Sequence, residues 1–357
     1  MGRKVTLKDI ADRVGVSTAT VSYVLNGKEQ YISQEIKERI FAAVKEMGYY
    51  TNMNAKSLVS RRSRLIGIVV PQTEGRETQL FANNFYSEIL SNVEYIARNN
   101  GYQIIISGMD LNDNYLRIAH ERGLDGIIAI GIYQNEFFDQ LEKTDIPMVI
   151  IDSYCRSGKY LNIRIDDEEG SYTAAKHLID KGHRNIGFLC GHIQENGVMQ
   201  KRYIGYRRAL AEAGIELDER FVFEGTVGYH SGLELSERIA KEQPQLTGVV
   251  CSADILAIGL MKGLAQQNIR VPEDISVIGF DDLEICQYLS PGLTTIRQQI
   301  ASKGQIAMEK LLQAIDRHLN DPEEEEKFED VVLPVELIER DSVREVKNGS
   351  GVTAPGR

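Results

Sequence analysis

The stretch from Thr6 to Asn26, TLKDIADRVGVSTATVSYVLN, constrains the fold more than any other part of the chain. Its first apolar residues recur with the spacing of one helical face, and they are Leu7, Ile10, Ala11 and Val14. Asp9 lies three residues after Thr6, as in a capping box, and Gly15 supplies the positive φ that commonly ends a helix. Ser17 then caps a second helix. The stretch therefore predicts two short helices joined by a tight turn.

The second of these helices has an outward face almost free of acidic charge. Val21, Val24 and Leu25 point back to the first helix. The residues that face outward are small or able to form hydrogen bonds, and they are Thr18, Ala19, Ser22, Tyr23 and Asn26. The major groove of DNA accepts such a face on the second helix of such a pair. A helical hairpin buried in a protein core is the alternative.

The distribution of charge favours the DNA-binding alternative. Residues 1–64 carry twelve Lys and Arg against six Asp and Glu, a net charge of +6, whereas the whole chain carries −11. The remaining residues therefore net −17. A basic head on an acidic body indicates that the head meets phosphate and the body does not.

After the head, the pattern changes to alternating strands and helices. A continuous apolar run at 65–70 is typical of a strand buried on both faces. Further strands are predicted at 103–107, 126–130, 148–152, 186–190, 221–225, 248–252 and 277–280, with helices between them. A long helix runs to Leu319, and the strand-like VVLPVELIER follows. This alternation predicts an α/β fold in which two lobes each contain a parallel sheet.

Other features exclude several classes of protein. No apolar run reaches the ~18 residues that span a bilayer, and the amphipathic start is unlike a signal peptide. The four cysteines are widely spaced and form no CxxC pair, which favours reduced thiols over a metal site or a disulfide framework. We therefore expect a cytoplasmic protein, with reduced thiols, no metal and no membrane partner.

The polar residues that follow predicted strands indicate a binding cleft. Ligands of open α/β sheets bind at the carboxyl ends of the strands, where Asp152, Asp254 and Asp281 are expected. Carboxylates at a cleft suit the vicinal hydroxyl groups of a sugar, although any one of these residues could instead be a helix cap or a turn residue. Arg202 could complement these carboxylates from a helix or lie on the surface. Phe85 and Tyr86 could stack on a sugar or pack in the core.

Catalytic motifs are weak by comparison. The six histidines show no ligand spacing, and the sequence contains no GxSxG, no GxxxxGK[ST] and no GxGxxG after the strand at 65–70. The adjacent carboxylates of Asp281 and Asp282 point in different directions. We therefore expect neither an enzyme nor a bound cofactor.

Three segments carry a family resemblance, and they are VTLKDIADRVGVSTATVSYVLNG, NAKSL and VIGFDDLEICQYLSPGLTTIRQ. They resemble the lac/gal-repressor (LacI/GalR) family of bacterial transcriptional regulators, and the resemblance covers roughly residues 5–344. It implies a helix-turn-helix domain at 1–51, a hinge helix and linker at 52–64, and a body like a periplasmic binding protein at 65–344. The body's lobe 1 would comprise about 65–165 and 298–328, and lobe 2 about 166–297 and 329–344. Residues 345–357 would be a disordered tail.

The resemblance also implies residue roles. The positions expected to meet DNA are Thr6, Ser17, Thr18, Ala19, Thr20, Ser22, Tyr23, Asn26, Lys56 and Leu58. Among them, Thr18, Ala19 and Tyr23 would read bases, and Leu58 would wedge into the minor groove, with Lys56 standing where Arg is more usual. The positions expected to meet an effector are Phe85, Tyr86, Asp152, Arg202, Val227, Ala253, Asp254 and Asp281.

Together these features predict a homodimeric repressor of carbohydrate-utilisation genes. It would bind a pseudo-palindromic operator in double-stranded DNA and respond to a sugar-like effector in the cleft between the lobes. Ala253 and Val227 differ from common sugar-binding residues of the family, and the loop 71–84 is longer and more charged than usual. A nucleobase or nucleoside effector, a solute-binding protein and an α/β enzyme are the alternatives.

Overall fold

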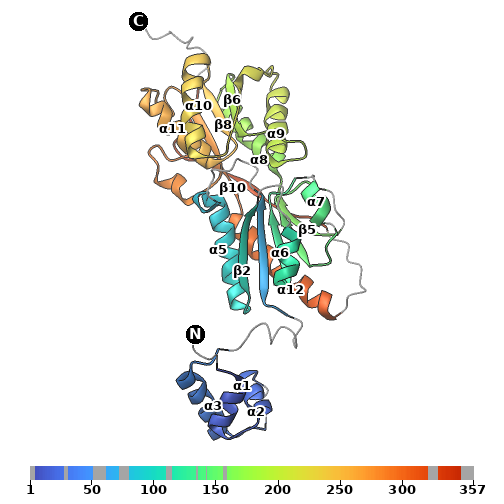
Figure 1. Cartoon of the computed structure of the whole chain (residues 1–357). Coiled ribbons are helices and arrows are strands. Elements are labelled where there is room, and N and C mark those ends of the chain that lie inside the picture. Colours follow the sequence, from blue (N-terminus) through green and yellow to red (C-terminus); the bar gives the residue numbers. More distant parts are fainter. Residues whose placement is uncertain are drawn as a thin grey trace. The chain divides into compact units, whose positions relative to one another are not determined.

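The computed structural model of the chain describes residues 5–27, 31–50, 62–71, 80–109, 115–133, 136–141, 143–155, 159–320 and 329–346. The chain divides into two compact units, Met1–Ser63 and Arg64–Arg357 (Figure 1). The predicted hinge helix, with Lys56 and Leu58, lies mostly outside the described residues, as does the charged part of the loop 71–84.

The described residues of the first unit contain three helices, and the first two begin at the predicted caps. They are α1 (Leu7–Val14), α2 (Thr18–Leu25) and α3 (Gln34–Met47). Thr6 and Asp9 form a reciprocal capping box, because each side chain accepts a hydrogen bond from the other residue's backbone N–H. Gly15 ends α1 in the left-handed region at φ 76°. Residues such as Ile10, Val21 and Ile40 are fully buried and form the core of this unit.

The second unit contains two lobes, and the sheet of the first lobe is entirely parallel. Its strands are β1 (Leu65–Pro71), β2 (Gln103–Met109), β3 (Gly126–Ile130), β4 (Met148–Ile151), β5 (Leu161–Ile165) and β11 (Val331–Leu333), in the order β11-β5-β4-β3-β1-β2. Its helices are α5 (Asn84–Asn99), α6 (Tyr115–Arg122), α7 (Glu136–Leu141) and α12 (Ile300–Asn320), preceded by the short η1 (Leu80–Ala82). Helices α5 and α12 pack together on one face of the sheet, and α6 and α7 cover the other.

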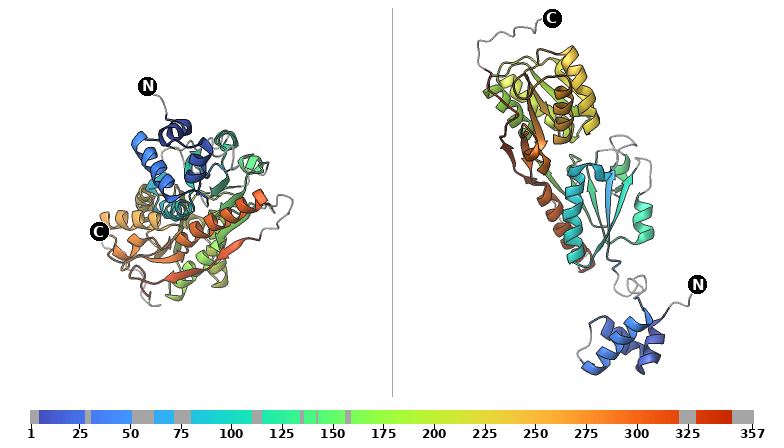
Figure 2. Two further views of the ribbon diagram at one scale, coloured as in Figure 1. Left: turned by 90° about the horizontal axis from the view of Figure 1, so that it is seen from below. Right: turned by 90° about the vertical axis from the view of Figure 1, so that its left-hand side faces the viewer.

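The second lobe repeats this layered arrangement. Its strands are β6 (Ile186–Gly191), β7 (Val222–Gly225), β8 (Gly248–Cys251), β9 (Ser276–Asp281), β10 (Thr294–Gln298) and β12 (Val335–Ile338), in the order β12-β10-β9-β8-β6-β7. Its helices are α8 (Asp167–Asp180), α9 (Val198–Glu212), α10 (Tyr229–Glu242) and α11 (Asp254–Gln266), with the short η2 (Glu219–Phe221) and η3 (Glu284–Tyr288). The pairs α8–α9 and α10–α11 cover opposite faces (Figure 2). The predicted two-lobed α/β body is thus confirmed.

The structure corrects the prediction at the ends of the two sheets. Strands β5 and β10 were not predicted, because their polar residues interrupt the apolar runs that mark the other strands. The segment VVLPVELIER is not one strand, since Pro334 separates β11 in the first sheet from β12 in the second. The chain therefore returns to lobe 2 after Leu333 and not at 329. Strand β12 also runs antiparallel to β10, so the second sheet is not wholly parallel.

The end of the described chain is held against lobe 2. The N–H of Val346 donates to the carbonyl of Lys181 at 2.8 Å, although residues from 345 onward were expected to be a disordered tail. Residues 347–357 lie outside the described part of the chain. Among the described helices, none is long and apolar enough to cross a membrane.

Helices α10 and α11 approach each other closely through glycines. A Cβ built on Gly259 would lie 2.1 Å from the carbonyl oxygen of Tyr229, and one on Gly232 would lie 2.2 Å from that of Leu256. Because the obstructing atoms belong to the backbone, they cannot turn aside as a flexible side chain could. Only glycine allows this crossing without moving a helix.

We expect Gly259→Ala to lower the free energy of unfolding by ~1–2 kcal/mol. The added methyl group forces α10 and α11 apart, which outweighs the ~1 kcal/mol that alanine gains over glycine in a helix. Urea unfolding of the full chain measures the change. The control Ala265→Leu enlarges an exposed residue of the same helix and should change stability by less than ~0.5 kcal/mol. An unchanged or higher stability of Gly259→Ala would contradict the packing argument.

Candidate functional site

The outward face of α2 is exposed as the sequence predicts. Val21 and Val24 are buried against the other helices, while Thr18, Ala19 and Asn26 are exposed and Tyr23 is 54% exposed. Ser17 caps the helix by accepting from the backbone N–H of Thr20 at 3.0 Å, and its hydroxyl lies 2.9 Å from the Thr20 hydroxyl. Ser22 is half-buried, and its carbonyl accepts from the amide of Asn26. The face thus presents hydroxyl, methyl, phenol and amide groups without an acidic side chain.

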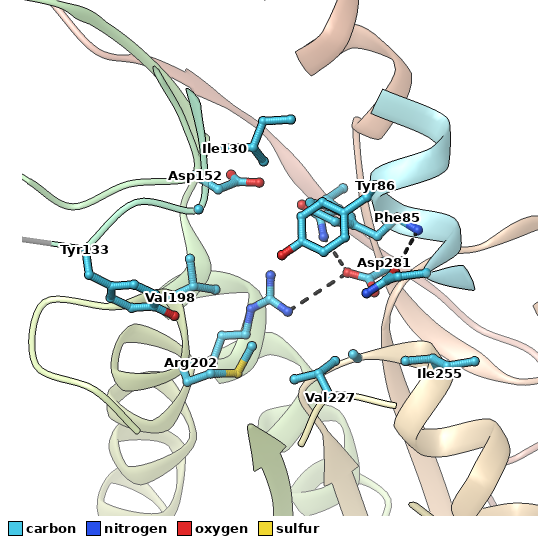
Figure 3. A pocket seen from close by; sticks show the side chains of 15 residues that line it. Phe85, Tyr86, Ile130, Tyr133, Asp152, Val198, Arg202, Val227, Ile255 and Asp281 are labelled. Carbon is cyan, nitrogen blue, oxygen red and sulfur yellow. Dashed lines mark hydrogen bonds and ion pairs between the residues drawn. The ribbon is translucent and has the colours of Figure 1, made fainter. Parts of the chain in front are cut away.

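The body contains a cavity of about 90 Å³ between the two lobes. Residues of both lobes line it (Figure 3), and they are Asn83, Phe85, Tyr86, Ile130, Gly131, Tyr133, Asp152, Val198, Met199, Arg202, Val227, Ala253, Ile255, Asp281 and Gln298. Seven of the eight residues predicted to meet an effector are in this set, all except Asp254. The cavity therefore lies where the carboxyl ends of the strands of the two sheets face each other.

The two carboxylates of the cavity stand on unusual backbone conformations. Asp152 follows β4 with φ 53°, and Asp281 ends β9 with φ 126°. Non-glycine residues rarely adopt positive φ, and such strain concentrates at functional sites. The strained backbone turns both carboxylates to the cavity.

Arg202 enters the cavity from the first turns of α9 and is 5% exposed. Its guanidinium forms an ion pair with Asp167 at 2.8 Å and donates to the carbonyl of Ser252 at 2.5 Å. It also lies 4.0 Å from Asp281, which it faces in Figure 3, and 3.6 Å above the centroid of the Phe280 ring. Arg202 therefore does complement a cleft carboxylate, but its closer ion pair is with Asp167, which was not predicted.

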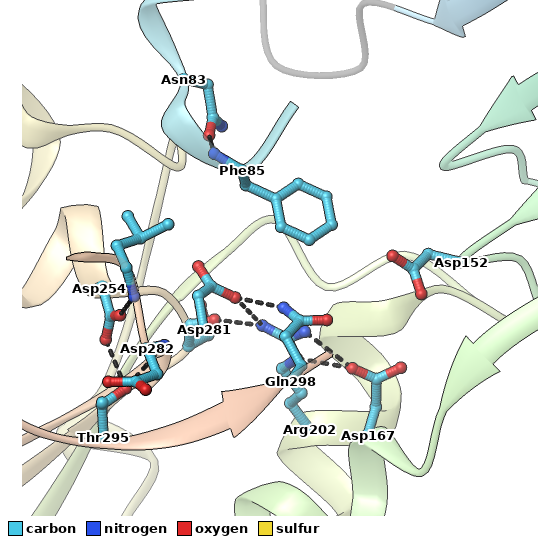
Figure 4. Close-up of polar contacts among 12 residues, drawn as sticks. Asn83, Phe85, Asp152, Asp167, Arg202, Asp254, Asp281, Asp282, Thr295 and Gln298 are labelled. Carbon is cyan, nitrogen blue, oxygen red and sulfur yellow. Dashed lines mark hydrogen bonds and ion pairs between the residues drawn. The ribbon is translucent and has the colours of Figure 1, made fainter. Parts of the chain in front are cut away.

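A buried lysine holds the other carboxylate. Lys303 of α12 is 0% exposed, and its ammonium group donates to both carboxylate oxygens of Asp152 at 2.6 and 2.7 Å. It also donates to the side-chain oxygen of Gln298 at 2.5 Å, while the amide nitrogen of Gln298 donates to Asp281. Figure 4 shows Gln298 and Arg202 between Asp281 on one side and Asp167 on the other, with Asp152 farther away. These contacts link the two lobes beneath the cavity.

Asp254 lies elsewhere than predicted. It opens α11 with 0% exposure, and its carboxylate accepts from the Thr295 hydroxyl at 2.6 Å and the Leu283 backbone N–H at 2.8 Å. In Figure 4 it stands beside Thr295, while Asp281 turns toward Gln298. Because Asp254 follows a strand, the sequence predicts the correct end of the sheet for this residue. It does not predict the direction of the side chain. Its observed contacts fasten the turn after β9 to α11.

Aromatic and apolar side chains complete the cavity. Phe85 and Tyr86, at the start of α5, pack edge to face with their ring centroids 5.4 Å apart. Tyr133, which follows β3, packs so closely on Gly197 that a Cβ there would lie 2.4 Å from the ring. Tyr133, Gln298 and Asn83 were missed by sequence reasoning, although the first two follow or end strands as Asp152 does. A position at or just after the end of a strand could therefore have identified Tyr133 and Gln298 as cavity residues.

Burial perturbs the protonation of the cavity carboxylates. It raises the pKa of Asp281 to about 8, although Arg202 nearby acts in the opposite direction. Burial also raises the pKa of Asp152, and Lys303 opposes this effect. Throughout the described residues, no group of three or more His, Cys, Asp or Glu is arranged to hold a metal ion.

Comparisons with known proteins agree with this architecture. The family model for bacterial regulatory proteins of the lacI family matches residues 6–52, and the model for a periplasmic binding protein-like domain matches residues 175–343. The HTH-type transcriptional repressor PurR of Vibrio vulnificus (strain CMCP6) is 36% identical to this chain, over 96% of this chain and 99% of that protein.

Solved structures show the same likeness. The lac repressor dimer bound to operator and the anti-inducer ONPF has a TM-score of 0.81 at 25% identity, over 96% of this chain and 100% of that one. A complex of the transcriptional regulator CelR with cellobiose has a TM-score of 0.69 at 26% identity, over 95% of this chain and 100% of that one. The fold and these relatives define a transcriptional regulator and not an enzyme. The chain belongs to the LacI family of bacterial regulatory proteins.

The pKa of Asp281 makes stability depend on pH in a defined direction. Between 3.8 and about 8 the folded chain retains a proton that the unfolded chain releases, so the free energy of unfolding falls as the pH rises across this range. We expect Asp281→Asn to make this fall shallower by up to ~1.4 kcal/mol per pH unit, the effect of one proton.

Urea unfolding at a series of pH values from about 5 to about 8 measures the slope. Asp274→Asn is the control, because the bonds that Asp274 accepts from Arg270 lower its pKa to about 2, and it stays ionised across the range. A parent-like slope for Asp281→Asn would show that Asp281 is already ionised in the folded chain.

Proposed function

We propose that this protein is a transcriptional repressor that binds operator DNA through α2 and is controlled by a small uncharged effector in the cavity. The observation that carries the proposal is the exposed, uncharged, hydrogen-bonding face of α2. A helix with this face enters a major groove without repelling phosphate and reads base edges through single hydrogen bonds and methyl contacts. The basic charge of residues 1–64 supports the same role.

The residues proposed to meet DNA are Thr6, Ser17, Thr18, Ala19, Thr20, Ser22, Tyr23 and Asn26, together with Lys56 and Leu58. In this proposal Thr18, Ala19 and Tyr23 read bases, and the residues Thr6 and Ser17, which cap the N-termini of α1 and α2, contact the backbone of the duplex. Helix N-termini favour phosphate because their N–H groups point outward.

For the effector we propose a sugar, and the cavity supports an uncharged ligand. The carboxylates of Asp152 and Asp281 suit hydroxyl groups, and the rings of Phe85, Tyr86 and Tyr133 suit the apolar face of a sugar ring. The structural relative CelR was solved with cellobiose. A nucleobase is the alternative, because the same aromatic rings would stack on a planar heterocycle.

A homodimer completes the proposal. Two copies of α2 would read the half-sites of a pseudo-palindrome, and the lac repressor relative was solved as a dimer on its operator. On this chain, α5 and η3 line one surface hollow, and large apolar side chains are exposed on both helices and on η1, namely Tyr95 on α5, Ile285 and Tyr288 on η3, and Phe81 on η1. Such a group of exposed apolar residues supports an interface between copies.

The first experiment identifies the operator. The full chain is incubated at moderate salt with sheared DNA from its source genome, and the retained fragments are sequenced. We expect enrichment of a pseudo-palindrome, and sedimentation of the complex should give two chains per site. Retention without a common site that vanishes as salt rises would overturn the proposal, since it would reflect charge alone.

The second experiment identifies the effector class. The operator complex is titrated with ribose, glucose, cellobiose, hypoxanthine and guanine, and DNA binding is followed by fluorescence anisotropy. An effector that prefers one arrangement of the lobes must change operator affinity, and operator must change effector affinity by the same factor. A response to sugars only would support the carbohydrate proposal, and a response to the purines only would replace it with the nucleobase alternative.

We expect Tyr23→Ala to lower operator affinity about tenfold to hundredfold, the equivalent of losing one specific base contact. Phe41→Ala on α3 is the matched control, because Phe41 is 51% exposed and Tyr23 is 54% exposed. Anisotropy titrations with the enriched site measure both variants. Equal losses for the two would show that the effect comes from the stability of the helical unit, and no loss for Tyr23→Ala would remove α2 from base reading.

A further inference from the structure

Lys303 stands behind the wall of the cavity and contacts it through three residues that line it. Its ammonium group bonds Asp152 and Gln298, and it lies 5.5 Å from the centroid of the Phe85 ring. Lys303 itself is fully buried and is not among the residues that line the cavity. It can therefore act on a bound effector only through these neighbours.

The ammonium group fixes the orientation of the Gln298 amide. A lysine ammonium has three N–H donors and no acceptor, and here they meet two oxygens of Asp152 and one of Gln298. Since only the oxygen of the amide can face Lys303, the nitrogen of Gln298 must face the other way, where it donates to Asp281. The same nitrogen carries a second N–H, and because Gln298 lines the cavity we assign this N–H as the donor to a ligand. Without Lys303, either orientation of the amide would be possible.

The same lysine keeps Asp152 an acceptor. A carboxylate buried without a cation takes up a proton and becomes a donor, whereas the ion pair with Lys303 favours the ionised form. A carboxylate has about four lone-pair sites, so Asp152 can accept from an effector as well as from Lys303. An effector that brings an anionic group to Asp152 meets a like charge.

The charges around the cavity leave little attraction for an anion. In the described part of the chain, both buried cations near the cavity are paired with carboxylates, Arg202 with Asp167 and Lys303 with Asp152. Asp281 is the third acidic residue at the site, and it brings no positive charge that could attract an anion. The arrangement suits a ligand that forms hydrogen bonds but carries no charge.

We infer that Lys303 is a positioning residue that sets the effector specificity of the cavity, with Asp152 as acceptor and Gln298 as donor toward an uncharged ligand. Such a ligand brings a hydroxyl or N–H group to Asp152 and an oxygen or nitrogen acceptor to Gln298. Monophosphate esters of the same ligand are rejected. This inference rests on the proposed function, because it assumes that the cavity is the effector site.

The test is a mutant cycle on the full chain. Lys303→Met replaces the ammonium with an apolar side chain of similar length, and Asp152→Asn removes the opposing charge. The double variant K303M/D152N contains neither charge, so it avoids the unpaired buried carboxylate that could prevent Lys303→Met from folding. Lys310→Met on the exposed side of α12 is the matched control.

Calorimetry measures binding of two compounds. The first is the uncharged compound that changes operator binding in the effector titration, and the second is its monophosphate ester. We expect the parent and Lys310→Met to bind the neutral compound and to reject the ester. Lys303→Met should bind the neutral compound at least tenfold more weakly, and the double variant should bind it more weakly than Asp152→Asn alone. Unchanged affinity in Lys303→Met, with the double variant equal to Asp152→Asn, would overturn the inference and leave Lys303 a purely structural ion pair.

A second measurement needs no ligand and separates failure of this inference from failure of the proposed function. Solvent exchange of the side-chain amide protons of Gln298 is followed by NMR, with the signals assigned through their absence in Gln298→Glu. We expect slow exchange in the parent and in Lys310→Met, and at least tenfold faster exchange in K303M/D152N. If no panel compound binds the parent, the effector proposal fails while this result still decides whether Lys303 orients Gln298. Equal exchange in all variants would overturn the inference.

Discussion

The body depends on a balance of charges buried between its lobes. In the described part of the chain, three acidic residues and two cations are buried at the cavity. Asp152, Asp281 and Arg202 line it, while Asp167 pairs with Arg202 and Lys303 pairs with Asp152. An unpaired buried charge costs several kcal/mol, so each cation must meet its carboxylate in the folded chain. Burial raises the pKa of the third carboxyl group, that of Asp281, to about 8, and Arg202, which is already paired with Asp167, opposes this effect only in part. Because the two ion pairs cancel in charge, the cluster is nearly neutral at pH 7. It can therefore pack beside the apolar residues that line the same cavity.

The cluster also lies where the chain passes between the lobes. Asp167 begins α8 directly after the first passage from β5, and Gln298 ends β10 directly before the passage to α12. Tyr154, two residues beyond Asp152, donates to Asp167 at 2.8 Å and so ties the two lobes from the other side. A ligand that exchanges hydrogen bonds with any of these groups acts on segments that must move if the lobes reorient. Coupling between cavity and lobes then needs only a difference in affinity between two lobe arrangements.

The sequence predicts those features that local chemistry decides. The caps at Thr6 and Ser17 appear as expected because a hydroxyl in the right position satisfies exposed helix N–H groups. Side-chain direction at a strand end depends on the packing of distant segments. Asp254 and Asp281 therefore look alike in the sequence, but only Asp281 lines the cavity, while Asp254 accepts from Thr295. Lys303 is detectable in the sequence, because it lies three residues after Ile300 on the buried stripe of α12, where a charged residue is unusual.

The fold alone does not determine which effector binds. The lac repressor with ONPF and CelR with cellobiose share this architecture with the present chain, so the common strand ends locate a ligand without selecting it. Selection must come from the few polar groups whose donor or acceptor character is fixed. In this chain that character depends on a residue outside the cavity, since Lys303 determines which end of the Gln298 amide faces Asp281. A change in one buried helix residue can therefore alter what the cavity binds while leaving every residue that lines it in place.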